Sequence, residues 1–189
     1  MQATMIGAGM RRGERPRAAE WLGLAIALGG LAIMTSPGRT APDIGAALLM
    51  AVAGVAWGVY SLRGRRGGDP LVATAGNFLR GVPLVLAVSA AAGAGLLGPL
   101  GDAHVSARGA TLAAISGSVT SGIGYSLWYS ALPSLTATRA ALVQLSVPVL
   151  AAVGGVVILG EAVTSRLLLG GSAILAGVAV AVLARRARA

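Results

Sequence analysis

Six long windows without a charged residue constrain this chain more than any other feature. Each window holds 18 residues or more, and a membrane-spanning helix needs about 20. Apolar residues fill the windows without the alternation of period two that a membrane barrel requires. We therefore predict an all-α, polytopic transmembrane helix bundle with about six spans. The predicted spans are 18–36, 44–62, 71–97, 110–132, 136–159 and 166–184.

The composition excludes the common classes of soluble protein. Only 11% of the residues are charged, whereas a soluble domain has about 25%. Hydrophobic residues make up 56% of the chain even without its 29 glycines. Because the chain has no Cys, a secreted disulfide scaffold is excluded as well. The lipid bilayer is the first partner that we expect.

The distribution of arginine predicts how the helices are oriented. All 15 positive charges are Arg, and the net charge is +9. If successive loops alternate between the two membrane surfaces, eleven Arg residues fall on one side and three on the other. The side rich in Arg is expected to be cytoplasmic, which places both termini there. The positive charge is thus a topology signal, and we expect no nucleic-acid partner, although such a charge would indicate one in a soluble protein.

A weak internal repeat suggests how the spans are organised. The pairs Gly13-Glu14 and Gly160-Glu161 lie 147 residues apart. Five helices separate the two positions, and because five is odd the repeat units would point in opposite directions across the membrane. We therefore expect 39–189 to be one complete five-helix unit and 1–38 to be the end of a preceding, inverted unit. At the same offset the further identities are Gly7 with Gly154, Leu22-Gly23 with Leu169-Gly170, Leu28 with Leu175, Gly30 with Gly177 and Ala32 with Ala179.

On this alignment Met1 matches Pro148, in the middle of a predicted span. Four helices of the first unit would then be missing. The chain is expected either to lack its N-terminal half or to be a half-size form that pairs with a partner, such as a second copy in a homodimer.

Four groups of motifs follow one another along the chain. They are Gly13-Glu14 with Trp21-Leu22-Gly23 and Gly29-Gly30, then Asp69-Pro70 with Asn77-Phe78-Leu79-Arg80, then Gly124-Tyr125 with Trp128-Tyr129, and Gln144-Leu145 with Pro148-Val149 and Gly160-Glu161. In this order they resemble the EamA-like branch of the drug/metabolite transporter superfamily. The resemblance implies a ten-helix inner-membrane carrier of bacteria, often an exporter of small metabolites, amino acids or drugs. The alternative is a truncated remnant that does not transport.

Candidate substrate-binding residues cluster first in the span 110–132. Ser121, Tyr125 and Tyr129 are four residues apart and share one helix face, with Trp128 beside them. These side chains can form the aromatic wall of a substrate cavity. They can equally form an aromatic belt at the cytoplasmic interface.

The span 136–159 carries Gln144 and Pro148, again four residues apart. Pro148 cannot donate a backbone hydrogen bond, so it would free a carbonyl beside the Gln144 amide, either as a substrate contact or as a packing kink. Trp57 and Tyr60 in the span 44–62 can likewise either line a substrate cavity or pack between helices.

The span 71–97 contributes Asn77 and Arg80 as candidates, next to Pro83. Arg80 would lie about 15 Å along the helix from Pro70, at 1.5 Å per residue. A mid-membrane Arg favours an anionic substrate group. If 81–101 spans the membrane instead, Arg80 extends to the inner interface.

Catalytic chemistry finds no support in the residue types present. The chain has one histidine, His104, and no cluster of acids, so we expect no catalytic residue, no metal site and no cofactor. Glu14 and Glu161 are read as helix-end structural elements. Neither lies inside a predicted span, so no buried carboxylate is expected to relay protons.

Overall fold

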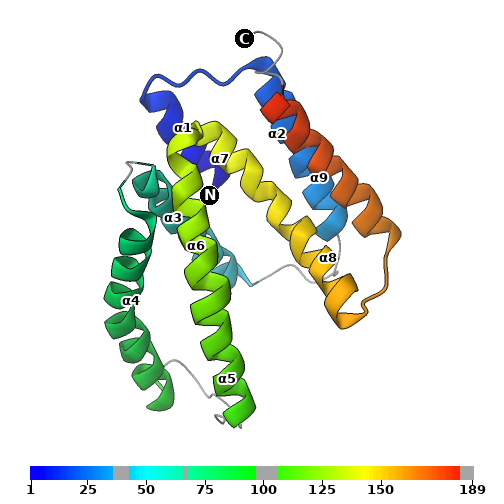
Figure 1. Ribbon diagram of the computed structural model, residues 1–189. Helices are drawn as coiled ribbons and strands as arrows, with labels where there is room; N and C mark the ends of the chain where they lie inside the picture. The colour runs from blue at the N-terminus through cyan, green and yellow to red at the C-terminus, as the bar shows by residue number, and fades with distance from the viewer. Residues whose placement is uncertain (36–42, 66–67, 97–105, 184–189) are drawn as a thin grey trace. The chain divides into compact units, whose positions relative to one another are not determined.

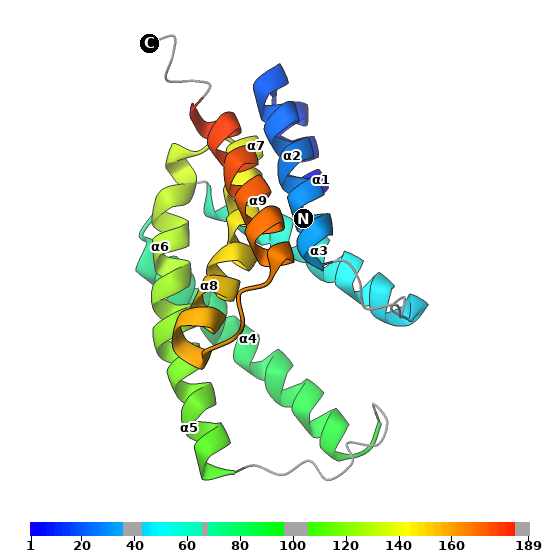
Figure 2. The ribbon, with the colours of Figure 1, turned by 90° about the vertical axis from the view of Figure 1, so that its right-hand side faces the viewer.

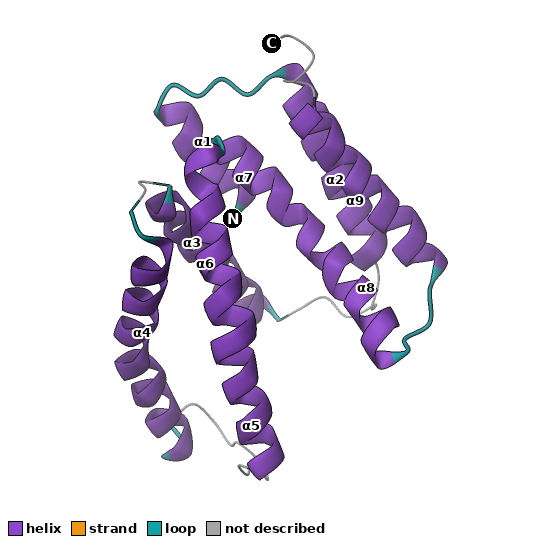
Figure 3. Ribbon diagram, in the orientation of Figure 1, coloured by secondary structure: helices purple, strands orange, loops and turns teal. Residues whose placement is uncertain are grey.

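The computed structural model describes residues 1–35, 43–65, 68–96 and 106–183. Helices account for the regular structure of this part of the chain, which contains no strand (Figures 1 and 3). The predicted all-α, polytopic helical architecture is confirmed. The contacts divide the chain into two units, the first formed by Met1–Arg63 with Leu135–Ala189 and the second by Gly64–Ser134. Each unit is described by itself.

Six α-helices build the described part of the first unit. Three come from the N-terminal part of the chain and three from the C-terminal part. They are α1 (Gln2–Arg11), α2 (Ala18–Thr35), α3 (Ile44–Gly64), α7 (Ala137–Val143), α8 (Val147–Leu159) and α9 (Ser165–Leu183). The predicted spans begin only at residue 18, and α1 lies before the first of them.

Helices α2 and α9 lie side by side along their whole length (Figures 1 and 2). A side chain on Gly30 would have its Cβ 2.6 Å from the carbonyl oxygen of Gly170. Gly23 makes the corresponding contact with the carbonyl oxygen of Gly177. As the residue number rises in α2 it falls in α9, so the two helices are antiparallel. Glycine allows this close backbone approach, which helix pairs in lipid need because no hydrophobic drive holds them together.

The core of the first unit lies where α2, α7, α8 and α9 meet. Its buried members are Ala27, Leu142, Leu145, Val149, Ile174 and Ala181. Small residues in α2 and late α9 face larger ones from the helices beside them, as close packing requires. Outside this core most large apolar side chains are exposed, as expected for helices that face lipid.

Three α-helices and a π-helical segment build the described part of the second unit. Asp69 begins α4 (Pro70–Gly93), because its carboxylate accepts hydrogen bonds from the amides of Leu71 and Val72 at 2.8 and 3.2 Å. An Asp at the cap followed by Pro in the first turn is a favoured helix start. The second half of this unit is one continuous helical run, which consists of α5 (Ala107–Ile115), a π-helical segment (Ser116–Ile123) and α6 (Gly124–Ala131).

The structure divides two of the predicted spans. The span 110–132 becomes α5, the π-helical segment and α6, and the span 136–159 becomes α7, a 3₁₀ turn and α8. Among the described residues, five helical segments are long and apolar enough to cross a membrane: Ala18–Thr35, Ile44–Gly64, Pro70–Gly93, Ala137–Leu159 and Ser165–Leu183. α5 and α6, with 9 and 8 residues, are each shorter than a span. The π-helical segment between them has the sequence SGSVTSGI, in which Gly is a poor helix former and Ser and Thr compete for backbone groups.

Local side chains and turns set the ends of two further helices. A short 3₁₀ turn at Leu132–Ser134 follows α6 and contains Pro133, which does not fit a helix interior. Thr164 caps α9 by accepting from the amide of Leu167 at 3.2 Å. His104 lies outside the described residues.

Candidate substrate-binding site

The first cluster of candidate residues joins α3 to the 3₁₀ turn (Gln144–Ser146) that precedes α8. The indole Nε1 of Trp57 donates a hydrogen bond to Gln144 Oε1 at 2.6 Å. The Tyr60 ring stacks on Trp57 with ring centroids 5.4 Å apart and planes 20° apart. All three side chains are partly buried. Trp57, Tyr60 and Gln144, which are far apart in sequence, thus form one polar aromatic surface in the first unit.

Pro148 shapes the backbone beside this cluster. It has no N–H to donate to the carbonyl of Gln144 four residues earlier, and the amide of Val147 takes that place. The result is the 3₁₀ turn Gln144–Ser146 between α7 and α8. In this structure the Gln144 carbonyl therefore accepts the Val147 amide in a tighter turn, and a substrate contact beside Pro148 stays a prediction. The kink itself is present.

The second cluster lies in the second unit, between α4 and α6. Asn77 Nδ2 donates a hydrogen bond to the hydroxyl oxygen of Tyr129 at 3.2 Å. The rings of Phe78 and Tyr125 approach with centroids 5.7 Å apart, tilted by 50°. Tyr129 is 7% exposed, so in this structure it makes a contact between helices. The shared face predicted for Tyr125 and Tyr129 does point toward α4.

The remaining candidates, Ser121, Trp128 and Arg80, lie outside the printed contacts of these two clusters. Ser121 and Trp128 are partly buried on the same helical run. Arg80 is exposed, and its guanidinium lies over the backbone of Gly76. The structure therefore does not bring Arg80 into the hydrogen bond between Asn77 and Tyr129.

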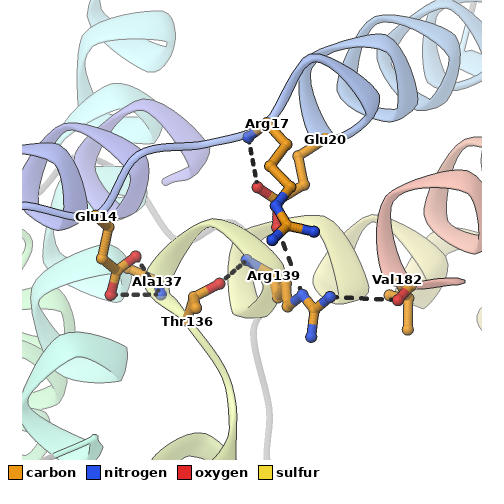
Figure 4. A network of polar contacts seen from close by, with 7 residues as sticks. All are labelled: Glu14, Arg17, Glu20, Thr136, Ala137, Arg139 and Val182. Atoms are coloured by element: carbon orange, nitrogen blue, oxygen red, sulfur yellow. Dashed lines mark hydrogen bonds and ion pairs between the residues drawn. The ribbon is translucent and has the colours of Figure 1, made fainter. Parts of the chain in front are cut away.

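A polar network at one end of the first unit was not predicted as a whole (Figure 4). The Glu14 carboxylate accepts the amide N–H of Ala137, the first residue of α7, at 2.9 and 3.2 Å. A carboxylate suits this place because the first amides of a helix lack partners and carry partial positive charge. Gly9 makes room for it, since a Cβ there would lie 2.6 Å from Glu14 Oε2. The helix-end role expected for the Gly-Glu pair is thus seen at Glu14.

Arg139 extends the network to α2 and α9. Its Nε lies 3.4 Å from Glu20 Oε1, and its Nη2 donates to the carbonyl of Val182 at 3.3 Å. Glu20 also accepts from the amide of Arg17 at 2.8 Å. Arg139 and Glu20 are 15% and 11% exposed in their side chains, so a nearly buried ion pair holds the start of α2 beside the end of α9.

Sequence reasoning missed this ion pair because its two partners lie 119 residues apart. In the sequence Arg139 counts only as one of the eleven Arg residues that indicate the cytoplasmic side. A usable signal was its place between two charge-free windows, since an isolated charge next to a span needs a partner when it is buried. The sequence did not indicate that Glu20 would supply it.

Comparison with known proteins identifies the family. The profile of the EamA-like transporter family matches residues 44–183, which run from the first residue of α3 to the last residue of α9. An uncharacterized protein of Pseudomonas aeruginosa is 47% identical over all 189 residues, and the chain spans 63% of the length of that relative. No solved structure matches the chain. With its apolar helices and this match, the chain is a multi-pass membrane protein that belongs to the EamA-like transporter family.

Proposed function

We propose that this chain is part of a secondary transporter that moves small organic metabolites, amino acids or drugs by alternating access, in the direction of efflux. Its family and its membrane-spanning helices support a transporter of the drug/metabolite type. The substrate surface is proposed to include Trp57, Tyr60, Gln144 and Pro148 in the first unit. In the second unit it is proposed to include Asn77, Arg80, Ser121, Tyr125, Trp128 and Tyr129.

One observation carries the mechanism: the glycine contacts of α2 and α9 are reciprocal. The sequence offset of 147 pairs Gly23 with Gly170 and Gly30 with Gly177. In the structure Gly23 contacts Gly177, and Gly30 contacts Gly170. Exchanging the two helices turns one contact into the other, as expected for elements related by a two-fold axis.

The antiparallel packing of α2 and α9 supports an opposite orientation of the two repeat units in the membrane. Equivalent helices that run in opposite directions belong to units of opposite orientation in the membrane, which is the architecture behind alternating access in many secondary transporters. On this proposal residues 1–38 end one unit and 39–189 form the other. On this proposal the first helices of the preceding unit correspond to the part of the Pseudomonas aeruginosa relative that this chain does not span.

The orientation can be tested with two single-cysteine variants, because the natural chain has no Cys. Arg15→Cys and Ala162→Cys are exposed positions that the offset of 147 makes equivalent. A membrane-impermeant maleimide added to intact bacterial cells should label Ala162→Cys and should label Arg15→Cys only after permeabilisation. Labelling of both variants from the same side would refute the inverted arrangement and the cytoplasmic placement of the N-terminus.

Transport itself is tested in proteoliposomes loaded with pooled radiolabelled amino acids or with ethidium. We expect efflux from liposomes that contain the protein, and a loss of efflux in Gln144→Leu, which removes the acceptor of the Trp57 hydrogen bond. Val143→Leu is the matched control on the neighbouring position.

A second candidate function follows from the length difference: the chain alone is a half-transporter that needs a partner. Efflux by the Pseudomonas aeruginosa relative together with no efflux by this chain would support that alternative.

A further inference from the structure

The turn between α1 and α2 recurs between α8 and α9. Gly13 and Gly160 lie 147 residues apart, and both have a positive φ, of 87° and 68°. Helices often end at a glycine in this left-handed conformation, which a side chain would strain. A glutamate follows each glycine, Glu14 and Glu161. The next helices, α2 and α9, begin at residues 18 and 165, again at the same offset, so the repeat is present in the structure as well as in the sequence.

Each of these glutamates folds back over the helix that it follows. The amide of Glu14 donates to the carbonyl of Gly9 at 2.9 Å, and the amide of Glu161 donates to the carbonyl of Gly155 at 3.3 Å. A Cβ on Gly9 would lie 2.6 Å from Glu14 Oε2, and a Cβ on Gly155 would likewise meet Glu161 Oε2. A glycine therefore makes room for the carboxylate in both turns.

The two carboxylates differ in what they bind. Glu14 accepts the amide of Ala137 at the start of α7 (Figure 4), and α1 packs against α7. Glu161 is exposed, and its carboxylate makes no hydrogen bond or ion pair with the described residues. By the offset of 147 residues, the equivalent of Ala137 falls before Met1. The described part of the chain therefore offers Glu161 no equivalent helix start.

The helix face beside Glu161 is uncovered in the same way. Ile6 of α1 is 5% exposed, whereas its equivalent Val153 on α8 is 49% exposed. Val157 and Ile158 of α8 are exposed as well. Lipid can cover such apolar side chains. It offers no row of free amides to the carboxylate, which the start of a helix does.

We propose that Glu161 caps the start of a membrane helix from a second repeat unit, as Glu14 caps α7. The first amides of a helix lack partners and carry partial positive charge, so a carboxylate suits them. The equivalence of the two turns gives the position of this helix: it packs against the exposed face of α8 and begins at the Glu161 carboxylate. The inference rests on the inverted repeat proposed above and names a contact that joins the two units.

The length of the Pseudomonas aeruginosa relative fits this partner. The 189 residues of the chain are 63% of that protein, so about 110 of its residues lie outside the match. Together with a segment equivalent to 1–38 they are about as long as the offset of 147 residues between the repeats. The relative therefore has room for one further unit of the same size.

The chain alone gives the first test, because it contains both glutamates in matched turns. Reversible unfolding in dodecyl sulfate is followed by circular dichroism. Glu14→Ala should lower the unfolding midpoint, whereas Glu161→Ala should leave it nearly unchanged, since only Glu14 caps a helix of this chain. Equal losses would show that Glu161 already has a partner within the chain and would overturn the proposal. No loss in Glu14→Ala would overturn it too, because that cap is its pattern.

The partner is tested with the part of the relative that lies outside the match. This part is expressed with an affinity tag in the same bacterial membranes as the full 189-residue chain, and the complex is purified and diluted in dodecyl maltoside. Glu161→Ala should raise the dissociation constant about three- to thirtyfold, the range expected for a lost helix cap. Val163→Ala, an exposed residue of the same loop, is the matched control and should bind normally. No complex with the natural chain, or equal binding by Glu161→Ala, would overturn the proposal.

Hydrogen exchange locates the contact within the complex. The amides that Glu161 accepts should exchange slowly in the complex with the natural chain and faster in the complex with Glu161→Ala. The affected amides should lie in the first turn of a membrane helix of the tagged polypeptide. An effect confined to a helix interior, or no effect, would overturn the cap even where the two polypeptides associate.

A second copy of this chain is the alternative occupant. Tagged and untagged copies should show no pairing that depends on Glu161, because α7 of each copy is already capped by its own Glu14. Such pairing would overturn the choice of partner. The cysteine labelling described above tests the orientation separately. Labelling from opposite sides together with an unaffected Glu161→Ala complex would refute the cap alone, whereas labelling from the same side would refute the inverted repeat.

Discussion

The contact between α2 and α9 can be tested by adding one methyl group to a glycine. In Gly30→Ala the new Cβ would lie 2.6 Å from the carbonyl oxygen of Gly170 and 2.8 Å from the amide nitrogen of Ile174. Both neighbours are backbone atoms, so a side-chain rotation cannot relieve the contact. The two helix axes must move apart by about 1 Å to restore an ordinary separation of about 3.5–4.0 Å.

The matched control is the adjacent residue in the same helix. Gly29→Ala places its Cβ where no atom lies within 4 Å. Both variants gain the same helix propensity, about 1 kcal/mol, so their difference isolates the steric effect. Overpacking of a close contact destabilises by about 1–3 kcal/mol, and Gly30→Ala should be less stable than Gly29→Ala by that amount.

The assay is reversible unfolding by dodecyl sulfate in mixed micelles, followed by circular dichroism. Gly170→Ala, the reciprocal change, should destabilise by a similar amount, since its Cβ would lie 2.7 Å from the carbonyl oxygen of Gly30. The double variant should lose less than the sum of the two, because one separation of the axes relieves both contacts. Equal unfolding midpoints for Gly30→Ala and Gly29→Ala would refute the close backbone approach.

Three further changes probe the polar contacts in the same unfolding assay. Glu14→Ala removes the carboxylate that caps α7 and should cost about 0.5–2 kcal/mol, while Glu14→Gln, which keeps an acceptor oxygen, should lose less; equal losses would contradict the cap. Arg139→Leu leaves the Glu20 carboxylate nearly buried without its cation and should cost about 3 kcal/mol, most of which the double variant with Glu20→Leu should recover; no recovery would show that the ion pair is not the cause. Tyr129→Phe should cost about 1 kcal/mol by removing the acceptor of Asn77, and the same change should cost less in an Asn77→Leu background; an equal cost in both backgrounds would contradict the contribution of this hydrogen bond.

The architecture could be predicted because the features that fix it are local. A charge-free window is a property of consecutive residues, and Asp69 caps α4 through amides two and three residues away. Backbone N–H and C=O groups in lipid must bond to one another, and a helix satisfies them within such a window. The spans 110–132 and 136–159 were the exceptions, since apolar length alone does not show where Gly and Ser will widen a helix into a π-helical segment or where a 3₁₀ turn will interrupt it.

The site could be predicted only in part, because its contacts join distant segments. Trp57 and Gln144 were each singled out, but a hydrogen bond across 87 residues depends on how α3 packs, which periodicity does not contain.

The reciprocal contact of α2 and α9 also bears on how copies of this chain can associate. A contact that is unchanged when its two halves are exchanged makes the same interactions whether both helices come from one copy or one helix is donated by a second copy. Domain-swapped pairs would therefore resemble the monomer in helix content and in local packing. Dilution before crosslinking separates the two forms, because the swapped contact weakens as the protein concentration falls and the internal contact does not.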